Sequence, residues 1–148
     1  MSHEGSTVPR SGSSASPSAL ERMITLRYQV ADIERASAFY TGSLGFLPSE
    51  KSGSAFAAVT RGNLRLILSG PGSSGSRPMP DGRRQEPGGW NRMVIYVDDL
   101  ASQIQSLKKS GARFRNEVEA GPGGKQILVE DPDGNPIELH EAPKTPTR

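Results

Sequence analysis

The stretch VADIERA, residues 30–36, decides the fold because its pattern returns as VDDLASQ at residues 97–103. In both places alternating apolar and polar residues, MITLRYQ and NRMVIY, lead up to the valine. Such alternation is typical of a half-buried strand. An aspartate then stands where it can cap a helix whose apolar residues recur at helical spacing. The sequence therefore predicts a strand followed by a helix, written twice.

The segments that follow each helix repeat as well. Each helix is expected to end at a glycine, Gly42 or Gly45 in the first half and Gly111 in the second. Further strands are expected at residues 46–50, 55–60, 63–69, 112–118, 125–130 and 136–140. Each half is too small to bury its own sheet face alone. The predicted fold class is α+β, with two tandem βαβββ modules that pair with one another.

Composition divides the chain further. Residues 1–20 are rich in Ser, Gly and Pro and are predicted to be a disordered tail, as are residues 143–148. Between them lie a first module at 21–70, a Gly/Pro-rich loop at 71–89 and a second module at 90–142. A loop of this length is typical of a lid or a mobile linker. Its Arg83 and Arg84 could close over an anion or remain solvated.

Bulk properties exclude several function classes. The chain has 148 residues, 33% of them hydrophobic, with 18 basic and 16 acidic side chains and no cysteine. Disulfides and thiolate chemistry are therefore absent, and the even charge balance does not predict a nucleic-acid partner. The sequence shows neither an apolar signal segment nor a run near the ~20 apolar residues of a membrane span. We expect a cytoplasmic protein without a membrane partner.

The first helix with its end, AFYTGSLGF at 38–46, and the closing EDPDGNPIELHE at 130–141 resemble the vicinal oxygen chelate superfamily. This group contains glyoxalase I, extradiol dioxygenases, fosfomycin resistance enzymes and bleomycin resistance proteins. The resemblance covers roughly Met23 to Glu141. It implies that the two tandem βαβββ modules form a curled mixed sheet with a concave cavity. In metal-dependent members it implies one divalent ion on the concave face. Because members include isomerases, dioxygenases, transferases and non-catalytic binders, the resemblance predicts fold better than function.

The metal ligands that the resemblance implies are mostly replaced in this chain. They lie seven residues before the aspartate that follows the first strand, on the fourth strand, and at the equivalent places in the second module. The side chains there are Thr25, Arg65 or Ile67, Arg92 and Glu138. Arginine is permanently positive and isoleucine has no donor atom. Since zinc and iron sites need about three protein ligands, we expect no metal and no other cofactor.

The cavity face is predicted to offer charged groups instead. Alternation places Thr25, Arg27, Arg92, Tyr96, Glu138 and His140 on it as candidate ligand-binding positions. Arg65, at one of the implied ligand positions, and Trp90, just before the fifth strand at the cavity mouth, are further candidates. We hypothesise that an ion pair between Arg92 and Glu138 fills the place of the metal. Arg27 could hold an anion or be a solvated rim residue. Trp90 could stack on a planar ligand or plug the junction between modules.

Glu138 and His140 are the weak catalytic candidates, because residues two apart on a strand point the same way. Glu138 could tune the pKa of His140, or His140 could be an ordinary exposed strand residue. We favour a metal-independent binder of a small, planar or anionic molecule, resembling the bleomycin resistance proteins and acting as a homodimer. The alternative is a metal-dependent lyase, isomerase or dioxygenase of the glyoxalase type with a displaced site. A structural partner protein that keeps only the fold is a third possibility.

Overall fold

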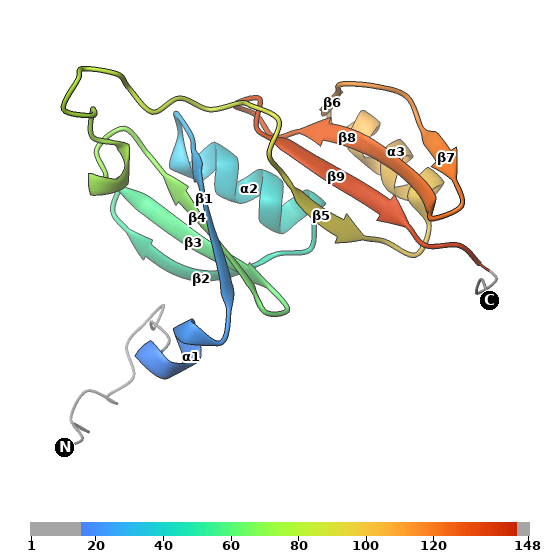
Figure 1. Ribbon diagram of the computed structural model, residues 1–148, viewed down its shortest axis with the longest axis horizontal. Helices are drawn as coiled ribbons and strands as arrows, with labels where there is room; N and C mark the ends of the chain where they lie inside the picture. The colour runs from blue at the N-terminus through green and yellow to red at the C-terminus, as the bar shows by residue number, and fades with distance from the viewer. Residues whose placement is uncertain (1–15, 145–148) are drawn as a thin grey trace. The chain divides into compact units, whose positions relative to one another are not determined.

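A computed structural model describes residues 16–144 of the chain. The chain forms two compact units, Met1–Glu86 and Pro87–Arg148, and each contains one βαβββ module. Each unit has one mixed sheet, of four strands in the first and five in the second, with a helix packed on one face (Figure 1). The α+β class and the repeated module predicted from the sequence are therefore confirmed.

The first unit holds a sheet of order β1-β4-β3-β2, in which β1 and β4 are parallel and the other pairs antiparallel. Its elements are α1 (Pro17–Glu21), β1 (Ile24–Gln29), α2 (Ile33–Ser43), β2 (Leu47–Ser52), β3 (Phe56–Arg61) and β4 (Leu64–Ser69). The side chain of Asp32 begins α2 by accepting the Arg35 N–H at 3.1 Å. The buried stripe of the helix packs against β3 and β4.

The second unit repeats this plan with a sheet of order β5-β9-β8-β6, to which β7 adds by pairing with β8. Its elements are β5 (Met93–Tyr96), α3 (Leu100–Lys109), β6 (Arg113–Phe114), β7 (Glu119–Gly121), β8 (Gly124–Glu130) and β9 (Pro136–Glu141). The side chain of Asp99 caps α3 by accepting the Ser102 N–H at 3.1 Å. Leu100 and Leu107 of the helix are buried, as are Ile95 and Leu139 of the sheet.

The strand expected at residues 112–118 is the clearest departure in the second unit, since only the two residues of β6 within this range are strand, and the three-residue β7 begins after it. The side-chain Oδ1 of Asn116 accepts the Leu128 N–H at 2.9 Å. That N–H is a backbone donor that a continuous ladder would use. The side chain thus interrupts the strand by taking the place of a backbone acceptor.

The boundaries at the first unit's ends also differ from the expectation. Residues 17–21, partly within the predicted disordered tail, form α1, whose N-terminal cap is Ser16. Residues 1–15 and 145–148, on which the other tail predictions fall, lie outside the described residues. The predicted loop at 71–89 contains the short 3₁₀ helix η2 (Ser74–Ser76), and the first compact unit runs on to Glu86.

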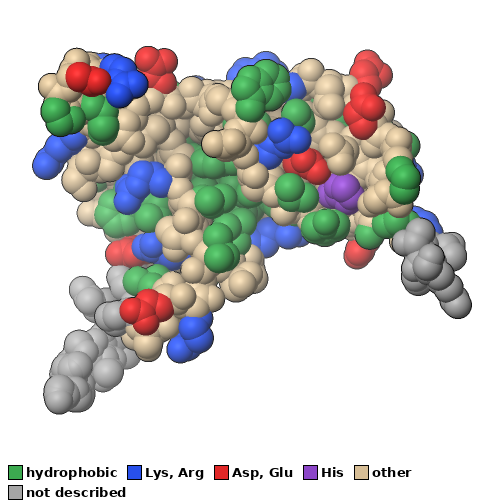
Figure 2. Space-filling view, in the orientation of Figure 1, with side chains coloured by type: hydrophobic (Ala, Val, Ile, Leu, Met, Phe, Trp, Pro, Cys, Tyr) green, Lys and Arg blue, Asp and Glu red, His purple; other side chains and the backbone are tan. Residues whose placement is uncertain are grey.

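Surface charge is mixed rather than concentrated. On the face shown in Figure 2, Lys and Arg side chains are interspersed with acidic and apolar ones, and one continuous basic stripe is not seen on it. Within residues 16–144, no helix has the length and apolar character needed to cross a membrane.

Candidate functional site

The strand register of the first unit places four side chains in one row across the open face of its sheet. Arg27 lies opposite Ile67, Ile67 opposite Ala58, and Ala58 opposite Glu50. Residues opposite one another on paired strands share a face, and this face is the one turned away from α2. Three strand spacings separate the ends of the row, so the Cα atoms of Arg27 and Glu50 are about 14 Å apart along the sheet.

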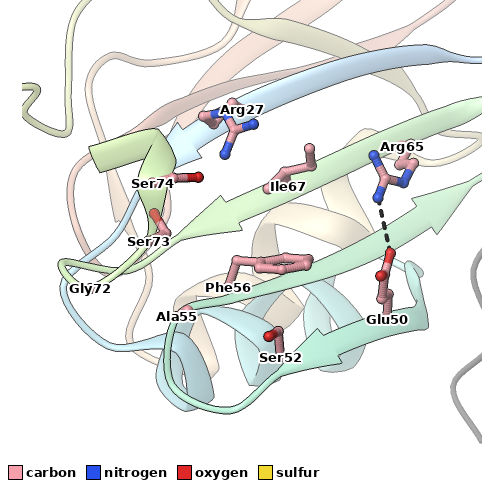
Figure 3. A pocket seen from close by; sticks show the side chains of 10 residues that line it. All are labelled: Arg27, Glu50, Ser52, Ala55, Phe56, Arg65, Ile67, Gly72, Ser73 and Ser74. Atoms are coloured by element: carbon pink, nitrogen blue, oxygen red, sulfur yellow. Dashed lines mark hydrogen bonds and ion pairs between the residues drawn. The ribbon is translucent and has the colours of Figure 1, made fainter. Parts of the chain in front are cut away.

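A cavity of about 310 Å³ lies over this row and the next. Its lining comes from all four strands and from the loop after β4: Arg27, Glu50, Ser52, Ala55, Phe56, Arg65, Ile67, Gly72, Ser73 and Ser74. Phe56 and Ile67 form an apolar floor between the Arg27 end and the Glu50–Arg65 end (Figure 3). The volume lies at the low end of the range typical of small-molecule sites.

Arg27 forms one end of the cavity. Its Nη1 donates a hydrogen bond to the hydroxyl of Ser69 at 2.7 Å, and Arg27 makes no ion pair with any described residue. Gly75 lies directly against the guanidinium, because a Cβ built on Gly75 would overlap Nη1 and lie 2.7 Å from Cζ. Among the described residues, no carboxylate therefore neutralises the positive charge of Arg27.

The loop that covers Arg27 is tied to the sheet by Gln29. The Gln29 side-chain amide donates to the carbonyl of Gly75 at 3.0 Å, and the Ser76 hydroxyl donates to Gln29 Oε1 at 2.6 Å. Gln29 occupies the same face of β1 as Arg27, two residues further on. These bonds fix the wall of the cavity next to Arg27.

The opposite end of the cavity is electrically neutral. Arg65 Nη2 donates to Glu50 Oε1 at 3.1 Å, and both side chains are largely buried. The charged side chains of the lining are therefore two arginines and one glutamate. The cavity carries one net positive charge, and it is located on Arg27.

On the equivalent face of the second unit, the charged side chains form hydrogen bonds with one another. Arg92 donates to Glu138 Oε1 from both Nε and Nη2, at 3.2 and 2.9 Å. The other carboxylate oxygen of Glu138 lies 3.2 Å from His140 Nδ1, so the two side chains do point to the same side, as the sequence predicts. Glu138 is only 8% exposed. The ion pair postulated between Arg92 and Glu138 is thus present.

Both ring nitrogens of His140 face oxygen acceptors. Its Nε2 lies 2.9 Å from the carbonyl oxygen of Gly123, while Nδ1 faces the Glu138 carboxylate. The Gly123 carbonyl and then the Glu138 carboxylate raise the pKa of His140 above its ordinary value, because both stabilise the protonated ring. A general base needs a free lone pair. With both nitrogens engaged, the side chain acts here as a tie between β9 and the β7–β8 turn.

Trp90 and Tyr96 lie beside this network in the second unit. The Trp90 ring covers the guanidinium of Arg115 with 4.5 Å from Cζ to the ring centroid, and it is 68% exposed. Arg115 is held in place by Glu130 and by the carbonyls of Gly89 and Gly134. Tyr96 lies with its ring centroid 5.0 Å from that of His140.

The predicted site residues thus fall into two groups. Arg27 and Arg65 line the cavity of the first unit, and Thr25 lies opposite Arg65 on the same face without lining the cavity. The second unit contains the remaining five: Trp90, Arg92, Tyr96, Glu138 and His140. Sequence reasoning missed the roles of Glu50, Phe56, Ser74 and Gly75. Alternation on β2 and β3 could have suggested the first two, whereas the loop residues lie in a segment without periodicity.

Comparison with known proteins gives the family. The family model described as "Glyoxalase/Bleomycin resistance protein/Dioxygenase superfamily" matches residues 22–139. The chain belongs to this superfamily. The resemblance noted in the sequence is thereby confirmed.

Two relatives show the range of activities. Mitochondrial methylmalonyl-CoA epimerase of Homo sapiens is 30% identical over 132 residues, which are 83% of this chain and 75% of that protein. The Arabidopsis thaliana protein named "Probable lactoylglutathione lyase, chloroplastic" is 30% identical over 134 residues, 84% of this chain. The chain spans only 37% of the length of that plant relative.

Solved structures share the fold. A superfamily member from Sphaerobacter thermophilus has a TM-score of 0.64 at 26% identity, covering 80% of this chain and 95% of that one. TnmS3, described as an antibiotic binding protein from Streptomyces sp. CB03234, has a TM-score of 0.62 at 24% identity, covering 82% and 95%.

Strand register settles which residue of the first unit corresponds to Glu138. The Val30 N–H bonds to the Ser69 carbonyl at 2.9 Å, and the Val97 N–H bonds to the His140 carbonyl at 2.8 Å. Ser69 therefore corresponds to His140, and Ile67, two residues earlier, corresponds to Glu138. Arg65, the other candidate, is excluded by this register.

The four residues at the family's ligand positions do not fit a divalent cation. Ile67 offers no donor atom, and the guanidinium of Arg92 already occupies the Glu138 carboxylate at 2.9 Å. Among residues 16–144, no three His, Cys, Asp or Glu side chains are grouped so that they could hold a metal ion. No chemical step through a metal can be derived from these side chains.

Proposed function

We propose that this protein is a metal-independent binder of a small anionic molecule, held in the cavity of its first unit. The observation that carries the proposal is the Arg27 guanidinium, which forms one end of a cavity of about 310 Å³, donates a hydrogen bond to the neutral Ser69 hydroxyl and makes no ion pair with a described residue. A guanidinium offers a planar fork of donors that matches carboxylate and phosphate oxygens.

The rest of the cavity supports a ligand with a flat or branched apolar body. The floor of Phe56 and Ile67 provides apolar contact, and Arg65 and Glu50 neutralise one another at the far end. Binding an anion at Arg27 would therefore bring the cavity to zero net charge. Such compensation matters because charges are weakly screened in a partly enclosed site.

Calorimetric titration with small molecules that differ in their acidic group tests this proposal. The panel would contain carboxylates, phosphate monoesters, sulfonates and neutral analogues. We expect binding of at least one anion, weakened about tenfold or more by Arg27→Gln, since hydrogen bonds to charged groups contribute about 1.5–3 kcal/mol. Arg83→Gln is the matched control, because Arg83 is 82% exposed and pairs with Asp81 outside the cavity. Equal losses in both variants would contradict the proposal.

A second candidate function is a metal-dependent lyase, isomerase or dioxygenase with a displaced site. What favours it is the 30% identity to methylmalonyl-CoA epimerase and to the plant protein named as a lactoylglutathione lyase. Elemental mass spectrometry of protein purified without chelator or affinity tag separates the two candidates. A stoichiometric divalent metal would support the enzyme, and a protein that stays metal-free after dialysis against zinc, nickel and manganese would support the binder.

Homodimer formation and a cytoplasmic location remain predictions. Sedimentation equilibrium over a range of protein concentrations tests the first, since a dimer gives twice the chain mass of 15.8 kDa. Fractionation of the source cells tests the second.

A further inference from the structure

The cavity of the first unit is unsymmetrical along its length, and this asymmetry restricts the ligand. Resting on the proposed function, we infer that the ligand is an aromatic carboxylate, with its carboxylate at Arg27 and Ser74 and its ring over Phe56 and Ile67. Each part of this assignment follows from a different feature of the lining.

The acidic group is assigned from the donors at the Arg27 end. The Ser74 side chain points into the cavity beside Arg27 (Figure 3), and its hydroxyl bonds to none of the described residues. Arg27 uses Nη1 for Ser69, which leaves further guanidinium N–H groups for a ligand. One guanidinium and one hydroxyl provide the two or three donors that a planar carboxylate accepts.

The charge of the ligand is assigned from the lining as a whole. The charged lining residues are Arg27, Arg65 and Glu50, and the last two are paired at 3.1 Å. A monoanion therefore neutralises the cavity. A phosphate dianion at Arg27 would exceed the single positive charge there and leave the cavity with one net negative charge. This favours a carboxylate over a phosphate monoester.

The body of the ligand is assigned from the floor and the span. Phe56 and Ile67 present apolar surface between the two ends, and Ala55 adds to it at the rim. The row from Arg27 to Glu50 spans about 14 Å between Cα atoms, and both side chains occupy part of this length. The remaining space suits one or two rings on a short side chain, whose far end can meet the polar Glu50–Arg65 pair.

Gly75 allows a test that leaves the arginine itself in place. A Cβ at this position would overlap the guanidinium of Arg27, the flexible end of a long side chain, and Gly75 has no positive φ. Gly75→Ala should therefore displace the guanidinium while the backbone stays as it is. Gly42→Ala is the matched control, because Gly42 lies in α2 of the same unit with nothing within 4 Å of the added Cβ.

The experiment is calorimetric titration of benzoate, phenylacetate, 4-hydroxyphenylacetate and indole-3-acetate. Each is compared with its neutral amide and with phenyl phosphate. We expect at least one carboxylate to bind about tenfold or more tightly than its amide and than phenyl phosphate. Gly75→Ala should weaken that carboxylate about fivefold or more, and Gly42→Ala should leave its affinity unchanged.

The outcomes that contradict the inference are distinct from those that contradict the proposed function. If phenyl phosphate binds more tightly than every carboxylate and depends on Arg27, the protein is an anion binder but the carboxylate assignment is wrong. If amides bind as well as acids, the carboxylate has no role. If neither the carboxylates nor phenyl phosphate bind, both the carboxylate assignment and the proposed function are wrong.

Discussion

The two units have the same strand order around β1 and β5 but use their open faces in opposite ways. In the first, Arg27 keeps a positive charge that is met only by a hydroxyl at the end of a cavity. In the second, Arg92 and His140 both contact the carboxylate of Glu138, so the charges are satisfied within the protein. A repeated backbone thus fixes where side chains lie, while their identity decides whether they are available to a ligand.

The contrast is sharpest at equivalent positions. Ile67 corresponds to Glu138 and Ser69 to His140 by strand register. A neutral pair in the first unit leaves Arg27 open to an external anion. In the second unit the Glu138 carboxylate binds Arg92, which corresponds to Thr25 of the first unit and not to Arg27. If this comparison is right, substitutions in the second unit affect stability, and substitutions around Arg27 affect ligand binding.

The largest expected effect is from Glu138→Ala. This change leaves Arg92 and His140 without their shared carboxylate. Because Glu138 is buried while Arg92 is partly exposed, we expect a loss of about 3 kcal/mol, at the low end of the cost of breaking a buried pair. Urea unfolding measures the free energy of unfolding. The double variant Arg92→Met, Glu138→Leu should recover most of the loss, because an apolar pair of similar volume needs no charge compensation. A stability unchanged by Glu138→Ala would show that the network is not structural.

The next largest effects are expected from two glycine substitutions, of which one lowers stability and the other lowers ligand affinity. A Cβ at Gly124 would overlap the backbone oxygen of Glu141 and would require φ of +118°, whereas one at Gly75 meets only a side-chain end. We expect Gly124→Ala to lower the free energy of unfolding by about 2 kcal/mol and Gly75→Ala by less than about 1 kcal/mol. Thermal and urea unfolding of both variants check this order, and a reversed order would contradict the comparison.

We expect pH to have a smaller effect on the free energy of unfolding, through the titration of His140. Its pKa is raised in the folded protein above the ordinary 6.5, first by the Gly123 carbonyl and then by Glu138. The stabilisation is therefore complete below the unfolded pKa and is lost as pH rises through the raised folded pKa. We expect stability to fall by less than about 1 kcal/mol across this range, because the interaction is partly screened by solvent. His140→Gln should remove this pH dependence, and a variant that keeps it would place its origin elsewhere.

The smallest expected effect is from Trp90→Leu. The ring covers Arg115 while remaining mostly exposed, and exposed cation–π contacts contribute about 0.5–1 kcal/mol. Arg115 keeps its bonds to Glu130 and two carbonyls, so the local fold should persist. Unfolding in urea would show the loss, and a decrease above about 2 kcal/mol would assign Trp90 a larger structural role.

Much of the fold could be predicted because it follows from local rules. Alternation gives the strands, and Asp32 and Asp99 mark the helix starts with side-chain caps that the structure contains. The interrupted strand at Asn116 could not be predicted, because its cause is a bond from the Leu128 N–H of the neighbouring strand β8 to the Asn116 side chain. Ile24 fits the predicted alternation yet is 61% exposed, since it begins an edge strand of its sheet.

The candidate site was only partly predictable for a similar reason. Alternation along the strands was enough to place Arg27 and Arg65 on the open face. The pairing of Arg92 with Glu138 was predicted from the ligand positions that the family resemblance implies. The wall made by Ser74 and Gly75 depends on how an aperiodic loop folds back onto Gln29. Such contacts join residues far apart in the sequence and have no local signature.

Backbone NMR of the uniformly ¹⁵N-labelled protein, titrated with an aromatic carboxylate, tests the central claim most directly. The account predicts shifts in the amides around Arg27, Ile67 and the 73–75 loop, absent in Arg27→Gln and retained in Arg83→Gln. Shifts concentrated around Arg92, Glu138 and His140, or shifts that survive Arg27→Gln, would contradict it.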